Sequence, residues 1–315
     1  MVVEMVGAAL TLQTLIRTLL LMEMLFYVWL GGHMANLGVA LGQIVGAILL
    51  IAVLWRLSHA LGSYLVAALL RWRDGRSLPM GNSLAALASE ISARAISYNW
   101  SQPFPRVALG ADPAGSGDGA PILLVPGFLS NRGMWVQFRR RLAAAKVGPV
   151  YTVTLEPFTG SIDEMVPSLQ ARIEEVLLET RREKIILVAH SMGGLVARAY
   201  MAQAGSNRVA RLITLGSPHH GTLLAGMGLF ECARQMQYQG PWLAMLADME
   251  EATPPEVPTL SIYTVNDDLV YPPESGVLAW AENVPVSAVG HVGLMYSAPV
   301  ANRVIAAIRK HILPE

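Results

Sequence analysis

A serine flanked by small residues is the candidate nucleophile of this chain. Ser191 lies within Ile185–Tyr200, where an apolar β-branched run ends at Ala189 and a helical pattern follows the serine at once. A serine hydroxyl is a weak nucleophile, and this strand–turn–helix layout exposes it to a general base and to backbone N–H donors. Gly193 and Gly194 leave room for the sharp turn. The layout predicts a nucleophile elbow, although a tight turn in another α/β protein would give the same A-x-S-x-G pattern.

The base and the acid that such a serine needs follow it in the chain order Ser, Asp, His. Asp267 lies just past the strand-like run Leu260–Val265, and His291 lies just past the run Val284–Val289. Loops at the carboxyl ends of parallel strands assemble at one edge of a sheet. We therefore expect His291 to take the proton of Ser191 and Asp267 to orient the imidazole. A turn-forming aspartate and a capping histidine are the alternatives.

These motifs resemble those of a known family. Residues from about 122 to 312 are similar to α/β-hydrolases of the lipase type, in particular to small bacterial lipases whose elbow also begins with Ala. The matching motifs are Pro126–Phe128, Ala189–Gly194, Asp267–Val270 and Gly290–Ser297. The resemblance implies that the backbone N–H groups of Phe128 and Met192 form an oxyanion hole. Pro126 replaces the histidine usual in the first motif, which should spare a hole built from backbone donors.

Two neighbouring aspartates compete for the role of triad acid. Consecutive residues at a strand end point in different directions, so one of them reaches His291. The spacing of Asp267 and Val270 matches the lipase arrangement. We therefore expect Asp267 to be the acid and Asp268 to face solvent or to brace the loop.

The segment Thr214–Thr222 is also similar to the lipase pattern, and it contains the adjacent residues His219 and His220. Neighbouring side chains diverge, and no cysteine or carboxylate cluster with ligand spacing accompanies them, so the pattern disfavours a metal site. We expect a shaped loop near the acyl pocket, and we expect His190 to be part of the scaffold. The predicted chemistry requires neither a metal nor an organic cofactor.

Composition limits the possible partners. The 315 residues include 23 basic and 23 acidic ones, a balance that gives no electrostatic footprint for nucleic acid. A single cysteine, Cys232, excludes an internal disulfide framework. The chain is 53% hydrophobic with a mean hydropathy of +0.42, and the apolar residues concentrate in the first 72 positions.

Two apolar stretches in that region are candidate membrane spans. Leu37–Trp55 is free of charged residues over nineteen positions, which as a helix is about 28 Å long, close to the thickness of a hydrocarbon core. Leu12–Leu30 is equally apolar but contains Arg17 and Glu23, and a charge at that depth should face a partner helix or a cavity. Two buried helices packed on the hydrolase are the alternative. The start of the chain lacks the basic region of a secretory signal.

The orientation follows from the arginines if both stretches span. Gly31–Asn36 would then be an uncharged turn on one side, with Arg71, Arg73 and Arg76 on the other. By the positive-inside rule, the catalytic domain would face the cytoplasm, with the anchor in a bacterial inner membrane.

The rest of the chain predicts a doubly wound, mostly parallel sheet of about six strands. We assign 1–72 to a membrane anchor of one or two helices, 73–120 to an amphipathic helix with a linker at Ala111–Ala120, and 121–315 to the catalytic domain. The last strand is predicted at Pro285–Val289. A Met-rich insertion at about 223–250 fits either a lid over the acyl pocket or a packed helix pair.

Together these features predict a membrane-anchored serine hydrolase that cleaves carboxylic esters, with acyl lipids as the expected substrates. An acyltransferase or thioesterase using the same triad is one alternative, and a membrane protein with a non-catalytic hydrolase domain is another. The sequence does not fix the oligomeric state.

Overall fold

The computed structural model describes residues 11–115, 119–228 and 230–312, and in these ranges six strands form one parallel sheet. The strand order is β2-β1-β3-β4-β5-β6. The strands are β1 (Ile122–Val125), β2 (Val150–Thr152), β3 (Ile185–His190), β4 (Val209–Leu215), β5 (Thr259–Thr264) and β6 (Glu282–Val286). The predicted α/β class and the compact six-stranded core are therefore confirmed.

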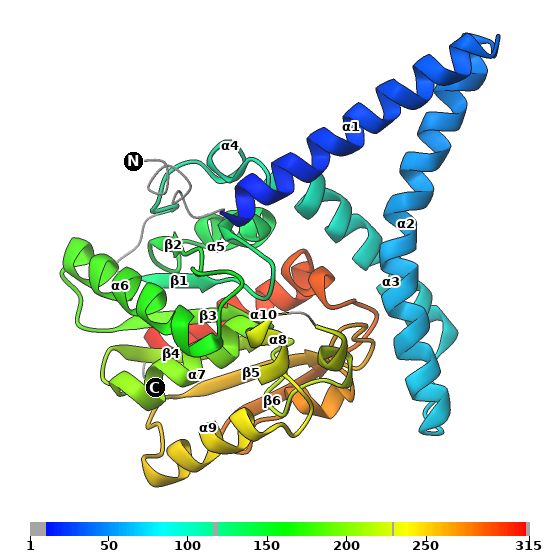
Figure 1. The fold of residues 1–315 in the computed structure, drawn as a ribbon. Coiled ribbons are helices and arrows are strands. Elements are labelled where there is room, and N and C mark those ends of the chain that lie inside the picture. Colours follow the sequence, from blue (N-terminus) through cyan, green and yellow to red (C-terminus); the bar gives the residue numbers. More distant parts are fainter. Residues whose placement is uncertain (1–10, 116–118, 229, 313–315) are drawn as a thin grey trace, which may run out of the picture.

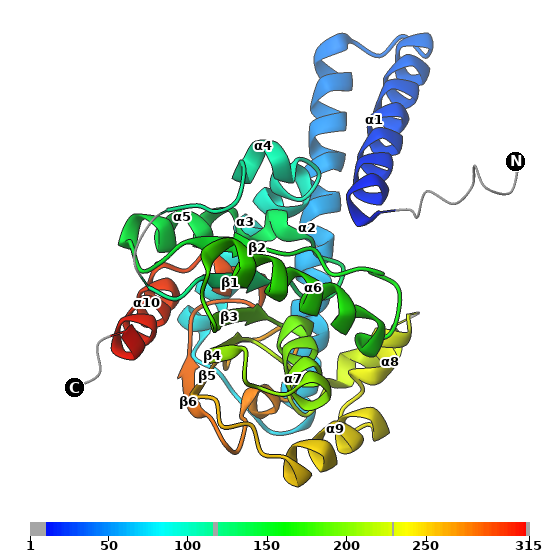
Figure 2. The ribbon, with the colours of Figure 1, turned by 90° about the vertical axis from the view of Figure 1, so that its left-hand side faces the viewer.

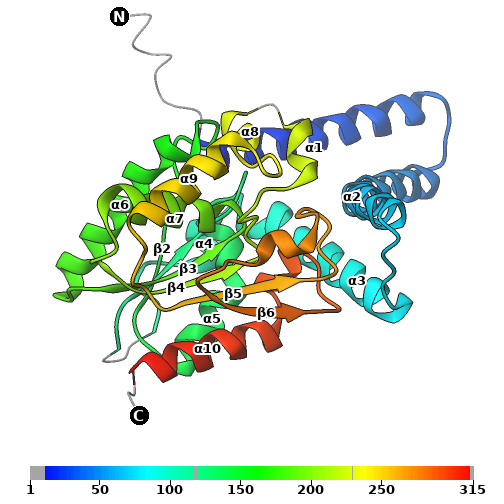
Figure 3. The ribbon, with the colours of Figure 1, turned by 90° about the horizontal axis from the view of Figure 1, so that it is seen from below.

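Helices cover both faces of this sheet, as Figure 3 shows. One face carries α6 (Ile162–Thr180), α7 (Met192–Ala204) and α9 (Pro241–Ala252), and the other carries α5 (Val136–Ala145) and α10 (Ala298–Ile312). Alternate residues of β1 enter the two layers: Leu123 and Val125 pack with α6 and α7, whereas Ile122 and Leu124 pack with α5 and α10. Burial on both faces explains why the strands are continuous apolar runs.

The last strand begins and ends three residues earlier than predicted. β6 spans Glu282–Val286, and the apolar residues after it leave the sheet. Ala288 has a φ of 59°, and its N–H donates to Asn266 Oδ1 instead of to a neighbouring strand. A positive φ interrupts the extended backbone. The strand was predicted too far along the chain because the prediction relied on the apolar run alone.

The N-terminal residues form a helical hairpin that projects from the body (Figures 1 and 2). It consists of α1 (Leu12–Asn36) and α2 (Leu41–Arg73), joined at Leu37–Ala40. The turn predicted at Gly31–Asn36 is therefore wrong: Gly31 lies within α1, where a side chain at its position would contact Ile44 and Ile48 of α2. Glu23 of α1 faces its partner helix as predicted, in a 2.6 Å ion pair with Arg56 of α2.

The two hairpin helices differ in how they meet the body. Among the described residues, α1 and α2 are the two helices long and apolar enough to cross a membrane. In the most apolar 18-residue stretch of each, 0% of the residues of α1 and 11% of those of α2 are buried. The alternative of two buried helices is thus wrong for these apolar stretches of α1 and α2. The second half of α2 does pack on the body, where Ala60, Tyr64 and Ala67 are buried.

The predicted amphipathic helix is α3 (Met80–Ile96), followed by a π-helical turn η2 (Ser97–Ser101) and α4 (Pro105–Leu109). Helix α3 lies against the body through Ala86, Glu90 and Ala93, which are fully buried. In the segment predicted as a linker, Asp112 forms ion pairs with Arg132, Arg139 and Arg172. Residues 1–10 of the predicted anchor, 116–118 of the predicted linker and Leu229 of the insertion lie outside the described residues.

Candidate active site

The turn between β3 and α7 holds Ser191 in a strained backbone conformation. Its φ is 54° and its ψ is −128°, values that a non-glycine residue rarely adopts. The Ser191 N–H donates to the Leu215 carbonyl of β4 over 2.9 Å, which fixes the turn above the sheet. A Cβ atom at Gly193 would lie 2.5 Å from the Pro126 carbonyl oxygen, and one at Gly194 would lie 2.1 Å from Ser217 Oγ. Both glycines are therefore required by close packing at the turn.

We expect Gly194→Ala to destabilise the turn, because the new methyl group overlaps Ser217 and cannot be accommodated without a backbone shift. Overpacking of this kind costs about 1–3 kcal/mol in the free energy of unfolding. Thermal unfolding of the purified chain measures the loss. Gly62→Ala is the matched control, since nothing lies within 4 Å of a Cβ atom there. Equal stabilities of the two variants would contradict the packing argument.

His291 and Asp267 meet in the loops that follow β6 and β5. His291 Nδ1 donates to Asp267 Oδ2 over 2.9 Å, and both side chains are at least 97% buried. The other oxygen of Asp267, Oδ1, accepts from the backbone N–H groups of Leu269 and Val270. Asp267 is thus a turn-forming residue and a histidine partner at once, so the two interpretations of this residue are compatible.

The Asp267 carboxylate sets the electrostatics of the imidazole. Burial acts to lower the pKa of His291, but the charge and hydrogen bond of Asp267 outweigh it, and the pKa is raised above its usual value. The Asp267 contact also fixes the tautomer: with Nδ1–H donating to the carboxylate, Nε2 is left as the proton acceptor. His291 is therefore suited to take a proton from a neighbouring hydroxyl.

Asp268 does not face solvent. Its side chain is fully buried, and its Oδ2 accepts from Arg94 Nη2 of α3 and from Ser63 Oγ of α2, each over 2.6 Å. Its Oδ1 accepts from the backbone N–H of His291 over 3.3 Å. Of the two alternatives for Asp268, a solvent-facing side chain is wrong because the N-terminal helices cover this loop, whereas its hydrogen bond to the N–H of His291 agrees with a residue that braces the loop.

The loop after β1 lies directly against the nucleophile turn. A Cβ atom at Gly127 would be 2.8 Å from Ser191 Cβ and 3.0 Å from the His190 carbonyl oxygen. Phe128 follows it, and Met192 is the first residue of α7, where a backbone N–H has no partner within the helix. The two residues implied as oxyanion donors by the resemblance thus stand in segments that meet beside Ser191.

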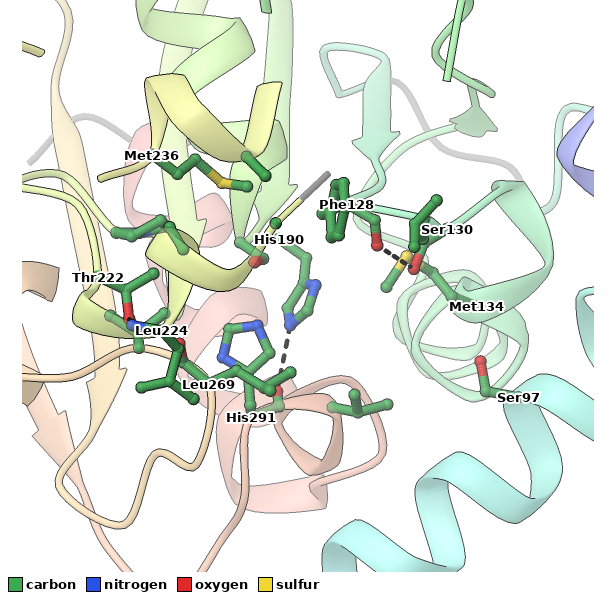
Figure 4. A pocket seen from close by; sticks show the side chains of 18 of the residues that line it. Ser97, Phe128, Ser130, Met134, His190, Thr222, Leu224, Met236, Leu269 and His291 are labelled. Atoms are coloured by element: carbon green, nitrogen blue, oxygen red, sulfur yellow. Dashed lines mark hydrogen bonds between the residues drawn. The ribbon is translucent and has the colours of Figure 1, made fainter. Parts of the chain in front are cut away.

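A cavity of about 240 Å³ opens between these loops and the insertion (Figure 4). Ser191, His291 and Phe128 line it together with Leu224 and Met236 of the insertion. The insertion divides in two: η4 (Leu223–Met227) and α8 (Glu231–Gln235) border the cavity, whereas α9 packs on α7 through an ion pair between Arg198 and Glu250. The packed-helix interpretation therefore describes α9, while a lid formed by η4 and α8 stays a prediction.

The other histidines near the turn hold structural positions. His190 Nε2 lies 3.1 Å from the His291 carbonyl oxygen (Figure 4), and burial together with the nearby His291 lowers its pKa well below its usual value, so it is neutral. His219 is buried between Thr214 and Arg198. Within the described ranges, no group of three or more His, Cys, Asp or Glu side chains has an arrangement suited to a metal ion.

Residues 122–310 match the model of the alpha/beta hydrolase family, which covers more than half of the chain. The chain belongs to the alpha/beta hydrolase family. The resemblance inferred from the elbow and the histidine motif is thus confirmed. The match begins at β1 and runs into α10, so it takes in every strand described above and leaves out the hairpin and α3.

Similar proteins carry lipase names. A triacylglycerol lipase of Pseudarthrobacter phenanthrenivorans is 40% identical over 57 residues, which is 18% of each chain, so the chain spans less than a fifth of that relative. Aspergillus fumigatus lipase B has a TM-score of 0.56 at 18% identity, over 67% of this chain and 58% of its own. Bacillus licheniformis lipase BlEst2 in its mature form has a TM-score of 0.51 at 19% identity, over 62% and 96%. These two structures share the fold.

Sequence reasoning missed the contacts that the N-terminal helices make with the candidate site, among them those of Ser63, Glu90 and Arg94. Glu90 lies at i+4 from Ala86 and at i−3 from Ala93, so it shares their buried face. A carboxylate on the small-residue face of a helix is the signal that could have identified it, because an unpaired charge is not buried in a core.

Proposed function

We propose that this protein is a serine hydrolase that cleaves carboxylic esters through a covalent acyl-enzyme, with Ser191 as nucleophile, His291 as base and Asp267 as the acid that orients it. The observation that carries the proposal is the 2.9 Å contact between His291 and Asp267 at the cavity that Ser191 lines. The strained turn at Ser191 and membership of a family with this chemistry add support.

In the proposed reaction, Ser191 Oγ attacks the ester carbonyl carbon while His291 Nε2 takes the hydroxyl proton. The N–H groups of Phe128 and Met192 stabilise the oxyanion of the tetrahedral intermediate. His291 then gives its proton to the leaving alkoxide, and the alcohol departs. Water, deprotonated by His291, attacks the acyl-enzyme and releases the carboxylic acid and free Ser191.

The acyl group is expected to be short to medium in length. The cavity, at about 240 Å³, is smaller than the roughly 300–1,000 Å³ typical of ligand pockets, and the apolar side chains of Leu224 and Met236 border it. Turnover of esters of graded acyl length by the detergent-purified chain should be fastest for short chains and should fall for the longest. A maximum at the longest chains would contradict this expectation.

Acyl transfer is the second candidate function that the same assay addresses. Adding an alcohol or a thiol to the ester assay and analysing the products separates transfer from hydrolysis. If the alcohol or thiol takes most of the acyl group in competition with water, the protein is a transferase. Free carboxylic acid as the main product supports the hydrolase.

We further propose that the hairpin anchors the enzyme in a membrane. Between Glu23 and Arg56, residues 24–55 include no Asp, Glu, Lys or Arg, and side chains such as Met24, Trp29 and Leu49 are about 60% exposed or more. Burying these side chains in lipid would remove a large apolar surface from water.

The hairpin leaves the body and returns to it (Figure 1). Arg17 donates to the Pro103 carbonyl oxygen, and Arg71 and Arg76 contact Asp267 and Glu274 of the body, whereas the turn at 37–40 carries no cation. This bias favours a bacterial inner membrane with the catalytic body on the cytoplasmic side. The uncharged part of α1 is about 20 Å long, so a crossing of a hydrocarbon core of about 30 Å would take the Glu23–Arg56 pair into the membrane.

The full chain is expected to stay in the membrane pellet after washing with alkaline carbonate, because its apolar hairpin has no other partner in the described structure. Release into the supernatant would show that the hairpin only rests on the membrane surface. A variant with two glutamates, Leu49→Glu and Leu54→Glu, should be released, since a charge at that depth costs about 2 kcal/mol or more.

A further inference from the structure

Two buried carboxylates and a partly buried arginine join the N-terminal helices to the loops of the candidate site. Glu90 and Arg94 of α3 form a 2.7 Å ion pair, and Arg94 also pairs with Asp268 over 2.6 Å. Ser63 of α2 donates to Asp268 as well, and Arg94 Nη1 donates to the His59 carbonyl oxygen of α2. Glu90 and Asp268 are fully buried. Because buried charges are costly when unpaired, this cluster ties α2 and α3 to the loop after β5.

The same carboxylates hold the backbone of the histidine loop at two points. Asp268 Oδ1 accepts from the N–H of His291, and Glu90 Oε2 accepts from the N–H of Gly293 over 3.0 Å. On the other side of the loop, the N–H of Gly290 donates to Ser89 Oγ of α3 over 3.0 Å. A Cβ atom at Gly290 would lie 2.5 Å from Glu90 Oε2. Residues 290–293 therefore rest directly on α3.

The charges around His291 do not balance. Asp267, Asp268 and Glu90 supply three negative charges when all are ionised, against the two positive charges of Arg94 and Arg71. The titratable and charged groups that face the loops from the surrounding elements are His190 of β3, Tyr64 and Arg71 of α2, Glu90 and Arg94 of α3, Tyr98 of η2, and Asp267 and Asp268 after β5. Arg71 donates to the Asp267 carbonyl oxygen. The excess of negative charge favours the protonated imidazole.

The pKa values have the directions that this arrangement requires. Burial, and then the nearby Asp268, raise the pKa of Glu90 to about 7. Burial acts to lower the pKa of His291, while Asp267 first and then Glu90 and Asp268 raise it, with a net increase. An imidazole with a raised pKa is a stronger base for a serine hydroxyl.

We propose that Glu90 is a positioning residue of the reaction: it holds the His291 loop through Gly293 and, together with Asp268, adds the negative charge that strengthens His291 as a base. The inference rests on the proposed function, because it assigns Glu90 a role in the same proton transfer. It also makes α3 and the second half of α2 part of the catalytic unit, although the family match begins only at residue 122.

The test is the pH dependence of kcat/KM for a short soluble ester, measured on the full chain in detergent. The base works as neutral imidazole, so activity is lost as pH falls through the pKa of His291. Glu90 has a pKa of about 7, so across the acidic limb it is only partly ionised; Glu90→Gln removes the negative charge that remains there and lowers the pKa of His291. We expect the acidic limb to move to lower pH by up to about half a unit, because Glu90 is only partly ionised there, with kcat reduced several-fold and KM nearly unchanged.

Glu250→Gln is the matched control, because Glu250 is also buried and paired with an arginine but lies on α9, away from His291. It should lose thermal stability without moving the acidic limb. If Glu90→Gln behaves like Glu250→Gln, Glu90 has a structural role only, and the inference is overturned. If Glu90→Gln does not fold, Asp268→Asn takes its place, and an unmoved limb in that variant overturns the charge argument equally.

The same measurements separate this inference from the proposed function. If the wild-type chain neither hydrolyses esters nor reacts with a fluorophosphonate, the proposed function fails. If the wild-type chain is active and the variants keep its pH profile, the role of Glu90 fails alone.

Discussion

Ser191→Ala is expected to reduce kcat for ester hydrolysis by about 10³-fold or more while the protein remains folded. Ser191 stands at the β3–α7 turn and lines the same cavity as His291. Without it no acyl-enzyme forms, and only the oxyanion donors and substrate binding contribute to the rate. The loss is measured in steady-state turnover and in labelling by a fluorophosphonate, which reacts with an activated serine.

Ser168→Ala is the matched control for this loss. Ser168 lies on α6, and its hydroxyl donates to the Thr154 carbonyl oxygen away from the cavity, so this variant should keep its activity and its labelling. Near-wild-type turnover by purified Ser191→Ala, or covalent labelling of that variant, would rule out Ser191 as the nucleophile.

Asp267→Asn is expected to lower kcat by up to about 10⁴-fold, with largely preserved KM. The asparagine keeps the size of the side chain, but its amide can turn an N–H toward Nδ1 of His291. The imidazole would then carry its proton on Nε2, which is the tautomer unable to accept from Ser191. Steady-state kinetics on folded, detergent-purified protein give the two constants separately.

Asp268→Asn is the comparison that tests the choice between the two aspartates. Asp268 accepts from Arg94, Ser63 and the backbone of His291, and it does not contact the imidazole in any described hydrogen bond. We expect reduced thermal stability and a shifted acidic limb, with a smaller loss of kcat than in Asp267→Asn. The reverse order of the two kcat values would transfer the role of acid to Asp268.

The sequence predicted the sheet and the site motifs because their signals are local. A β-branched run that ends at a serine and two glycines specifies both the strand and the turn at Ser191, and the spacing of Asp267 and Val270 specifies a turn at a strand end. These features depend on residues that are neighbours in the chain. The structure places His291 and Asp267 in contact, and their role in catalysis stays a prediction until variants are measured.

The contacts of α3 could not be predicted in the same way. Glu90 and Gly293 are 203 positions apart, and Ser63 and Asp268 are 205 positions apart. Helical periodicity identifies a buried face but not the element that covers it. For Asp268, solvent exposure and bracing of the loop both stayed open, since no residue near it in the chain indicates its ion pair with Arg94. The turn of the hairpin was placed too early for a related reason: Gly31 and Gly32 read as a loop, but in the structure they continue α1 beside α2.

The ion pair between Glu23 and Arg56 marks a point at which residues 24–55 could be removed from the hairpin. It brings two positions 33 residues apart within 2.6 Å, and the intervening residues contribute no contact with the catalytic loops in the hydrogen bonds described above. Replacing residues 24–55 by a short Gly/Ser loop would retain Ser63, Glu90 and Arg94 on their helices. We expect such a variant to need less detergent than the full chain and to keep its histidine loop supported, whereas cutting the chain at the family boundary near residue 122 would remove that support along with the hairpin.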